Sequence, residues 1–257
     1  MLFDSHTHTK FSADSKMLAT DAIARAESLN LGLVFTEHFD EELEGNFKFN
    51  PAEYINEYKN FRGNKVRLGV EVGMTKTARE INKNFVASAD FDQVIGSIHM
   101  LDGEDIYHKE FFDGKDKFSV YTNYFNVLAQ EAAVQDFDVL GHIDYICRAA
   151  TYSDTSIDYD TFKNEIDNVL KIVVEREKVL ELNTRRLRHA EIFMELKPVY
   201  ESYKNFGGRY VTIGSDAHRA EVIGDHFDEA LTFVEEIGLS VVTFRERKLQ
   251  GSRLVGK

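Results

Sequence analysis

The chain has 257 residues, of which 43% are hydrophobic and 29% are charged, as in ordinary globular proteins. Its 44 acidic and 31 basic residues give a net charge of −13, which argues against nucleic-acid partners because DNA and RNA bind cationic surfaces. The sequence has no apolar run of the roughly 18 residues that cross a bilayer, no secretory signal after Met1, and a single cysteine, Cys147, which excludes an internal disulfide. We therefore expect a cytoplasmic protein without membrane or nucleic-acid partners.

Short apolar runs alternate along the chain with longer amphipathic stretches. The runs are as short as buried parallel strands usually are, and they end near His6, Thr36, Glu71, His99, His142, Asn183 and Asp216. Helical patterns occupy residues 17–29, a segment that starts at Asn50-Pro51, and residues 119–134, 158–174 and 190–206. We expect Pro198 to kink or restart the last of these helices, and Gly207-Gly208 to end it.

This alternation predicts a parallel sheet covered by helices. Seven such units without a linker predict an α/β fold of one domain, residues 1–257, in the form of a closed (β/α)7 TIM-like barrel. An open doubly wound sheet is the alternative, although the glycine fingerprint of nucleotide-binding sheets is missing after the first strand. In such barrels the catalytic groups lie at the C-terminal ends of the strands.

Histidines gather at these predicted strand ends. Six of the nine are placed there, namely His6, His8, His38, His99, His142 and His218. The other three, His108, His189 and His226, fall in predicted loops or helix starts, and we interpret them as surface residues. Residues i and i+2 of a strand point to the same side, so His6 and His8 converge on one point, as metal ligands must. Asp216 and His218 repeat this spacing near the last predicted strand.

Glu71 is a carboxylate inside the apolar run from Gly69 to Gly73. Burying it without a partner would cost several kcal/mol, so it needs either a metal ion or a lysine or arginine from another element. We favour the metal. His99 and His142 are single histidines on apolar strands. Each alone would be typical of a hydrogen-bonded core residue, but the presence of the other candidate ligands favours metal ligation.

Asp14, in a polar loop, and His38 complete a set of nine candidate ligands: His6, His8, Asp14, His38, Glu71, His99, His142, Asp216 and His218. One zinc ion uses about four ligands, so the set suits two or three divalent ions. Three ions would bring more positive charge than the three carboxylates of the set neutralise. The excess would give this acidic chain a local positive site that attracts a phosphate dianion.

Six motifs carry a resemblance: Asp4-Ser5-His6-Thr7-His8, Thr36-Glu37-His38, Glu71, Gly96-Ser97-Ile98-His99, Gly141-His142-Ile143-Asp144 and Gly214-Ser215-Asp216-Ala217-His218. In order and spacing they resemble the polymerase and histidinol phosphatase (PHP) superfamily over nearly the whole chain. Residues 97–103, 181–184 and 187–188 are similar to its histidinol-phosphatase branch. Arg185 and Arg186 depart from the branch pattern, which has a small residue and a glycine there.

The resemblance implies a distorted seven-stranded barrel, two or three ions of zinc, manganese or iron, and hydrolysis of L-histidinol phosphate in histidine biosynthesis. It implies one ion held by His6, His8, Glu71 and Asp216, a second by Glu71, His99 and His142, and a third by Asp14, His38 and His218. We expect a metal-activated hydroxide to attack phosphorus. We expect Arg148 and Arg188, with Arg186 as a third candidate, to bind the phosphate oxygens.

Other functions remain open at this point. One alternative is a PHP-type phosphoesterase that acts on another small phosphorylated substrate, such as a nucleotide. An amidohydrolase-type metal hydrolase also begins with His-x-His, but it usually has a lysine on a middle strand and would leave Asp14 and His38 without a task. A regulatory or structural module usually loses ligands, whereas this chain keeps all nine.

Overall fold

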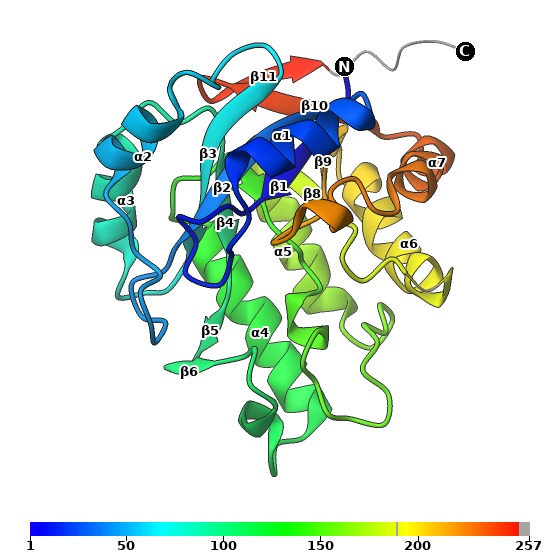
Figure 1. Ribbon diagram of the computed structural model, residues 1–257. Helices are drawn as coiled ribbons and strands as arrows, with labels where there is room; N and C mark the ends of the chain where they lie inside the picture. The colour runs from blue at the N-terminus through cyan, green and yellow to red at the C-terminus, as the bar shows by residue number, and fades with distance from the viewer. Residues whose placement is uncertain (189, 252–257) are drawn as a thin grey trace.

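The computed structural model describes residues 1–188 and 190–251 (Figure 1). Its main sheet has nine strands in the order β1 (Phe3–Thr7), β2 (Gly32–Phe39), β3 (Val66–Gly73), β4 (Val94–Ser97), β7 (Val139–Leu140), β8 (Val179–Asn183), β9 (Tyr210–Gly214), β10 (Ser240–Arg245) and β11 (Lys248–Gly251). Neighbours are parallel from β1 to β10, and only β11 is antiparallel to its neighbour. The seven predicted strands are confirmed as β1, β2, β3, β4, β7, β8 and β9.

The first strand also lies beside the end of β9. A parallel bridge joins Thr7 to Ala217. The amide of His8 donates to the carbonyl of Ala217 at 2.8 Å, and the amide of Asp216 donates to the carbonyl of His6 at 2.8 Å. This pairing sets the two i, i+2 pairs of candidate ligands next to each other.

The helices lie around the outside of these strands (Figure 1). They are α1 (Ala19–Ser28), α2 (Pro51–Tyr58), α3 (Arg79–Ala87), α4 (Lys117–Ala132), α5 (Lys163–Glu175), α6 (Ala190–Asn205) and α7 (Phe227–Ile237). Asn50 caps α2 as its sequence predicts: its side chain accepts from the amides of Ala52 and Glu53. The helices α3 and α7 and the strands β10 and β11 were not predicted.

The helix α6 runs through Pro198 without a restart, so of the two effects expected of this proline the kink stays a prediction. Proline removes the hydrogen bond to the carbonyl four residues earlier, which here belongs to Met194. Met194 is 71% exposed, so this carbonyl lies on a turn that faces water and needs no partner within the helix. The predicted stop is confirmed: Gly207 has a left-handed φ of 107°, and the amide of Gly208 donates to the carbonyl of Tyr203.

The hairpin of β10 and β11 packs at the opposite end of the strands from the histidines. Arg67, near the start of β3, donates from Nη1 to Thr243 Oγ1 at 2.9 Å and to the carbonyl of Phe244. Its guanidinium lies 4.1 Å from the centre of the Phe3 ring, at the start of β1. The short strands β5 (Met100–Leu101) and β6 (Glu104–Asp105) form a separate hairpin after β4. In the described residues, no helix is long and apolar enough to cross a membrane.

Cys147 is buried in a short 3₁₀ helix (Tyr145–Cys147), and burial raises the pKa of its thiol to about 12. We therefore expect the native chain at pH 8 to react with a thiol reagent such as DTNB about 100-fold more slowly than the urea-unfolded chain, because only the thiolate reacts. Labelling of the native chain should stay slow at pH 9, where labelling of the unfolded chain is already fast. Equal rates at pH 8 would contradict this placement.

Candidate metal centre

The structure brings all nine candidate ligands to the C-terminal ends of the strands. His6 and His8 come from β1 and the residue after it, His38 from β2, Glu71 from β3, and the remaining ligands from the segments that follow β1, β4, β7 and β9. Several of their side chains lie close enough to share one ion: His6, His8 and Asp216 form one such group, Glu71, His99 and His142 a second, and His8, His38 and His218 a third.

Glu71 lies at the centre of the cluster and is fully buried. Its Oε2 is 3.1 Å from His6 Nε2 and 3.0 Å from His38 Nδ1. Its Oε1 is 2.8 Å from His142 Nε2 and 3.3 Å from His99 Nε2. The two oxygens thus face different imidazoles, which is the arrangement of a carboxylate that bridges two ions.

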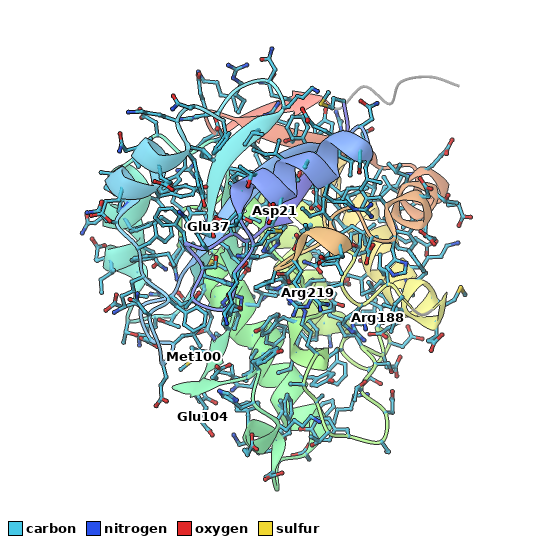
Figure 2. All side chains as sticks on the ribbon, viewed as in Figure 1. Asp21, Glu37, Met100, Glu104, Arg188 and Arg219 are labelled. Carbon is cyan, nitrogen blue, oxygen red and sulfur yellow. The ribbon has the colours of Figure 1, made fainter. Side chains whose placement is uncertain are left out.

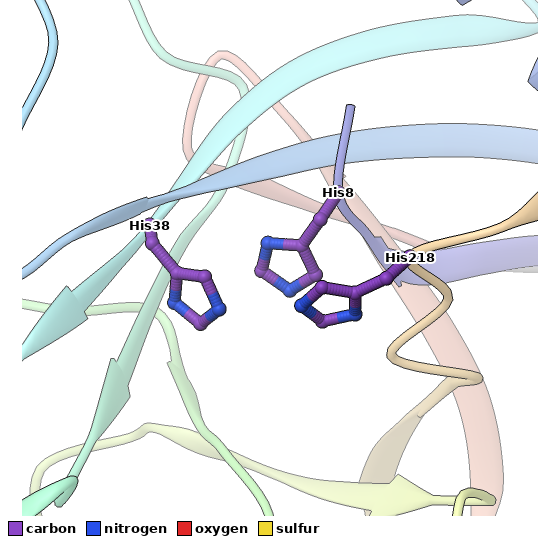
Figure 3. Close-up of side chains that lie close together, drawn as sticks. All are labelled: His8, His38 and His218. Carbon is purple, nitrogen blue, oxygen red and sulfur yellow. The ribbon is translucent and has the colours of Figure 1, made fainter. Parts of the chain in front are cut away.

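Figure 3 shows the outermost group, His8, His38 and His218, of which His38 and His218 line a cavity. The His8 ring stacks against His38 and His218, with centroids 4.1 and 4.3 Å away. Asp14 approaches this group from the loop after β1, with Oδ2 3.0 Å from His218 Nε2 and 3.7 Å from His38 Nε2. His8 therefore takes part in two close groups, and Asp14 reaches only the outer one.

Two carboxylates outside the set of nine ligands bind the Nδ1 atoms of imidazoles in the cluster. The sequence had suggested no role for either carboxylate. Glu181 Oε1 accepts from His6 Nδ1 at 2.7 Å, and Asp40 Oδ1 accepts from His99 Nδ1 at 2.9 Å. Glu181 carries the signal that revealed Glu71, since it is a carboxylate inside the apolar strand β8. Asp40 directly follows β2 and has no comparable signal.

Ser12 fixes the tautomer of His8. Its hydroxyl donates its one hydrogen to Glu37 Oε2 at 2.7 Å, so it accepts from His8 Nδ1 at 3.1 Å. The Nε2 of His8 is then left with a lone pair. That atom is buried and makes no hydrogen bond with any other described residue.

The cluster is short of positive charge, which is the strongest indication of metal ions. His6 has a carboxylate oxygen beside each ring nitrogen, from Glu181 and Glu71, although a neutral imidazole has only one N–H. His218 is in the same position, with the carbonyl of Asp216 at 2.9 Å on one nitrogen and Asp14 on the other. Each second contact needs either a proton or a metal ion between the two atoms. The donor set of imidazole and carboxylate fits zinc, manganese or iron.

The same shortage appears in the acid–base properties. Burial alone would raise the pKa of the Glu71 carboxyl, but the surrounding imidazoles, His6 foremost, hold it well below its ordinary value. Burial alone would lower the pKa of His6, but Glu181 and Glu71 raise it well above its ordinary value. Burial, together with the charges of His38 and His218, lowers the pKa of His8. Without ions, protons compensate the carboxylates, so ions must displace them.

The motif glycine Gly214 allows β9 to approach β1. A Cβ at this position would lie 2.4 Å from the Cβ of His6 and 2.5 Å from Glu181 Oε1. Two residues later, Asp216 has a left-handed φ of 54°, which aspartate tolerates better than most residues. The close approach and the left-handed turn together direct both Asp216 and His218 into the cluster.

The arginines near the site have different roles. Arg148 is partly buried and donates to Asp216 Oδ2 at 2.6 Å and to Asn183 Oδ1 at 3.0 Å. Arg185, for which the sequence suggested no role, lies 3.4 Å from Asp216 Oδ1. Arg186 points away, because its guanidinium is held by Asp144 at 2.6 Å and by Glu195.

A cavity of about 380 Å³ opens over the cluster. Arg148 and Arg185 line it together with Glu44 and Asp105, so its wall carries both signs of charge. A second cavity of about 430 Å³ shares Arg185, Asp216 and His218 with the first, and Arg188 lines only this second one.

The three histidines interpreted as surface residues are placed as follows. His108 has a 67% exposed side chain, 3.4 Å from Asp105, but it also lines the first cavity. His226 is only partly exposed and lines the second cavity. His189 lies outside the described residues.

Replacing Gly214 with alanine should disturb the centre, because the new Cβ has no room beside His6. We expect a loss of about 1–3 kcal/mol in the free energy of unfolding and a lower metal content per chain, measured by denaturant titration and by elemental analysis. Gly63→Ala is the control, since the nearest atom to its added Cβ is 4.0 Å away. Equal effects of the two changes would contradict the role of Gly214.

Glu181→Gln should weaken metal binding without removing a ligand, because the amide holds His6 less firmly than the carboxylate. We expect metal affinity to fall by about 10–100-fold, measured by competition with a chromogenic chelator. Glu175→Gln, at an exposed site on α5, should leave the affinity unchanged. A wild-type affinity in Glu181→Gln would show that Glu181 does not support the centre.

Comparison with known proteins agrees with this geometry. The family model of the PHP domain matches residues 4–185. A protein of Clostridium acetobutylicum named as a probable histidinol-phosphatase is 44% identical over 97% of this chain and 99% of its own length. A histidinol-phosphatase of Lactococcus lactis is 29% identical over 97% of both chains.

A solved structure is also similar. It is the crystal structure of a histidinol phosphate phosphatase from Lactococcus lactis in complex with zinc, L-histidinol and phosphate. It superposes with a TM-score of 0.92 at 28% identity, over 97% of this chain and 98% of that one. The chain therefore belongs to the PHP domain family and, within it, to the histidinol-phosphatases.

Proposed function

We propose that this chain is a metal-dependent phosphomonoesterase that hydrolyses L-histidinol phosphate to L-histidinol and phosphate, a step of histidine biosynthesis. The observation that carries the proposal is the buried cluster around Glu71, in which imidazoles and carboxylates lack compensating positive charge beside an arginine-lined cavity. The similarity to a phosphatase structure that holds zinc, L-histidinol and phosphate supports the same reaction.

The cluster would hold two or three divalent ions, of zinc, manganese or iron. His6, His8, Glu71 and Asp216 would hold one, Glu71, His99 and His142 the second, and Asp14, His38 and His218 the third. When bound, such ions supply an activated water and positive charge for the phosphoryl group. The protein itself would orient the ligand atoms. Glu181, Asp40 and Ser12 bind the Nδ1 atoms of three imidazoles, so that the Nε2 lone pairs of these imidazoles face the cluster.

Beside the metal cluster, Arg148 holds Asp216 in place. The guanidinium of Arg185 is more exposed to the cavity than that of Arg148. We assign Arg185 to the phosphate oxygens, as an arginine fork suits them. Arg186 is occupied by Asp144 and Glu195, so we assign it to structure rather than to the phosphate predicted for it. Arg188 faces the second cavity, where any contact with phosphate would take place.

The wall of the cavity also carries negative charge that suits the ammonium and imidazole groups of histidinol. Asp105 and Glu44 line it beside Tyr107. In the acidic loop of residues 102–105, Asp105 lines the cavity, whereas Glu104 pairs with Lys115 at 2.8 Å and Asp102 accepts from Asn123 at 2.7 Å. A wall that carries both signs of charge would orient a substrate that is anionic at one end and cationic at the other.

The fold proposal that accompanies this function is one domain of residues 1–257 built on a distorted (β/α)7 TIM-like barrel. The bridge between Thr7 and Ala217 supports it, since it links the first and seventh strands of the row. A cytoplasmic location stays a prediction.

The proposed function is tested with the purified, metal-loaded protein. We expect phosphate release from L-histidinol phosphate well above that from a panel of nucleotide and sugar phosphates. Chelation should abolish it, and added zinc or manganese should restore it. Efficient release from another phosphate ester would support metal-dependent hydrolysis but contradict L-histidinol phosphate as the substrate. A metal-loaded protein that is inactive on every phosphoester would contradict the whole proposal.

Asp105→Asn should raise KM for L-histidinol phosphate by about 10-fold, because a charge-assisted contact contributes about 1.5–3 kcal/mol. The KM for p-nitrophenyl phosphate, which has no cationic group, should change little. Asp102→Asn, in the same loop, is the matched control and should change neither constant. A parallel rise in KM for both substrates would show that Asp105 does not recognise the cationic end.

A further inference from the structure

The second cavity is lined by more positive than negative side chains. Its wall contains Arg185, Arg188 and Arg219, and apart from Asp216 at the metal centre it has one carboxylate, Asp225. Figure 2 shows Arg188 and Arg219 on the same face of the molecule, although they follow different strands. Such a concentration of arginine is notable in a chain of net charge −13.

Two of these arginines are free. Both Arg188 and Arg219 are exposed, and neither guanidinium makes a hydrogen bond or ion pair with another described residue. Elsewhere in the described chain arginines are commonly paired, as Arg62 is with Asp92, Arg79 with Glu131 and Arg247 with Asp138. Unpaired guanidinium groups that share one hollow are typical of a site for an anion that is not present.

The hydroxyl groups of the wall are already occupied. The hydroxyl of Ser215 donates to Asp4 at 2.6 Å, and that of Thr184 donates to the carbonyl of Asp225 at 2.7 Å. The arginines, with His226 beside them, are therefore the donors left to bind a ligand, and an anion that accepts from forked donors, such as phosphate, fits them.

The second cavity adjoins the metal centre. Arg185, Asp216 and His218 belong to both cavity walls, so an anion that leaves the metal cluster meets Arg185 first and then Arg188 and Arg219. We propose that this second cavity binds inorganic phosphate as a separate product site, through which phosphate leaves while the first cavity can already hold the next substrate. The proposal rests on the proposed function for the source of the phosphate, but not for the site itself.

The direct test counts phosphate ions. Calorimetric titration of the metal-loaded protein with inorganic phosphate at low ionic strength should give two phosphates per chain. Arg219→Ala should retain the site at the metals and weaken the second site by about 10-fold or more, while Arg219→Lys should restore part of the affinity. Arg209→Ala is the matched control, because Arg209 is exposed at the opposite end of β9.

Product inhibition gives an independent readout. Phosphate should inhibit the wild-type and Arg209→Ala proteins in a mixed pattern, since it binds beside the substrate, and should inhibit Arg219→Ala competitively. One phosphate per wild-type chain, or two undiminished sites in Arg219→Ala, would overturn the proposal. If the chain hydrolyses the substrate but binds one phosphate, only the proposal of a second site fails. If it binds two phosphates but hydrolyses no substrate, only the proposed function fails.

Discussion

The buried carboxylate of Glu71 sets the constraint on which the rest of the site depends. A charge with no access to water must be compensated, and the residues around it supply imidazoles rather than lysine or arginine. Two of those imidazoles, His6 and His99, are themselves backed by Glu181 and Asp40, so these compensating groups bring further negative charge. The remaining negative charge can be balanced only by cations from solution, and divalent ions supply the most charge in a small volume.

The acidic surface and the metal centre are two parts of one electrostatic design. A chain of net charge −13 repels phosphorylated molecules at a distance. Ions at the cluster and the arginines Arg148, Arg185, Arg188 and Arg219 reverse that field over a small region. A substrate that also carries positive charge is less repelled by the rest of the surface, which agrees with the presence of Asp105 and Glu44 in the wall of the cavity.

Much of this was readable from the sequence, for identifiable reasons. Strand ends and ligand spacing, such as His6 with His8, have a period of two and leave a clear pattern. The contacts of Arg186 left no pattern in the sequence, because whether its guanidinium binds phosphate or Asp144 depends on the direction of the side chain. Asp40 was missed since an aspartate after a strand is ordinary. The helix α7 and the hairpin of β10 and β11 were missed because none of the candidate ligands that mark the other strand ends lies beyond His218.

The bridge between Thr7 and Ala217 has a consequence for how the molecule forms. His6 and His8 come from the beginning of the described chain, while Asp216 and His218 come from near its end, so one ion shared by these ligands would tie a loop of roughly 200 residues. Such long-range contacts form late in folding, because the entropy of closing the loop must be overcome first. Ion capture would then act as the last cross-link of folding, and during synthesis on the ribosome the centre stays incomplete until β9 has emerged.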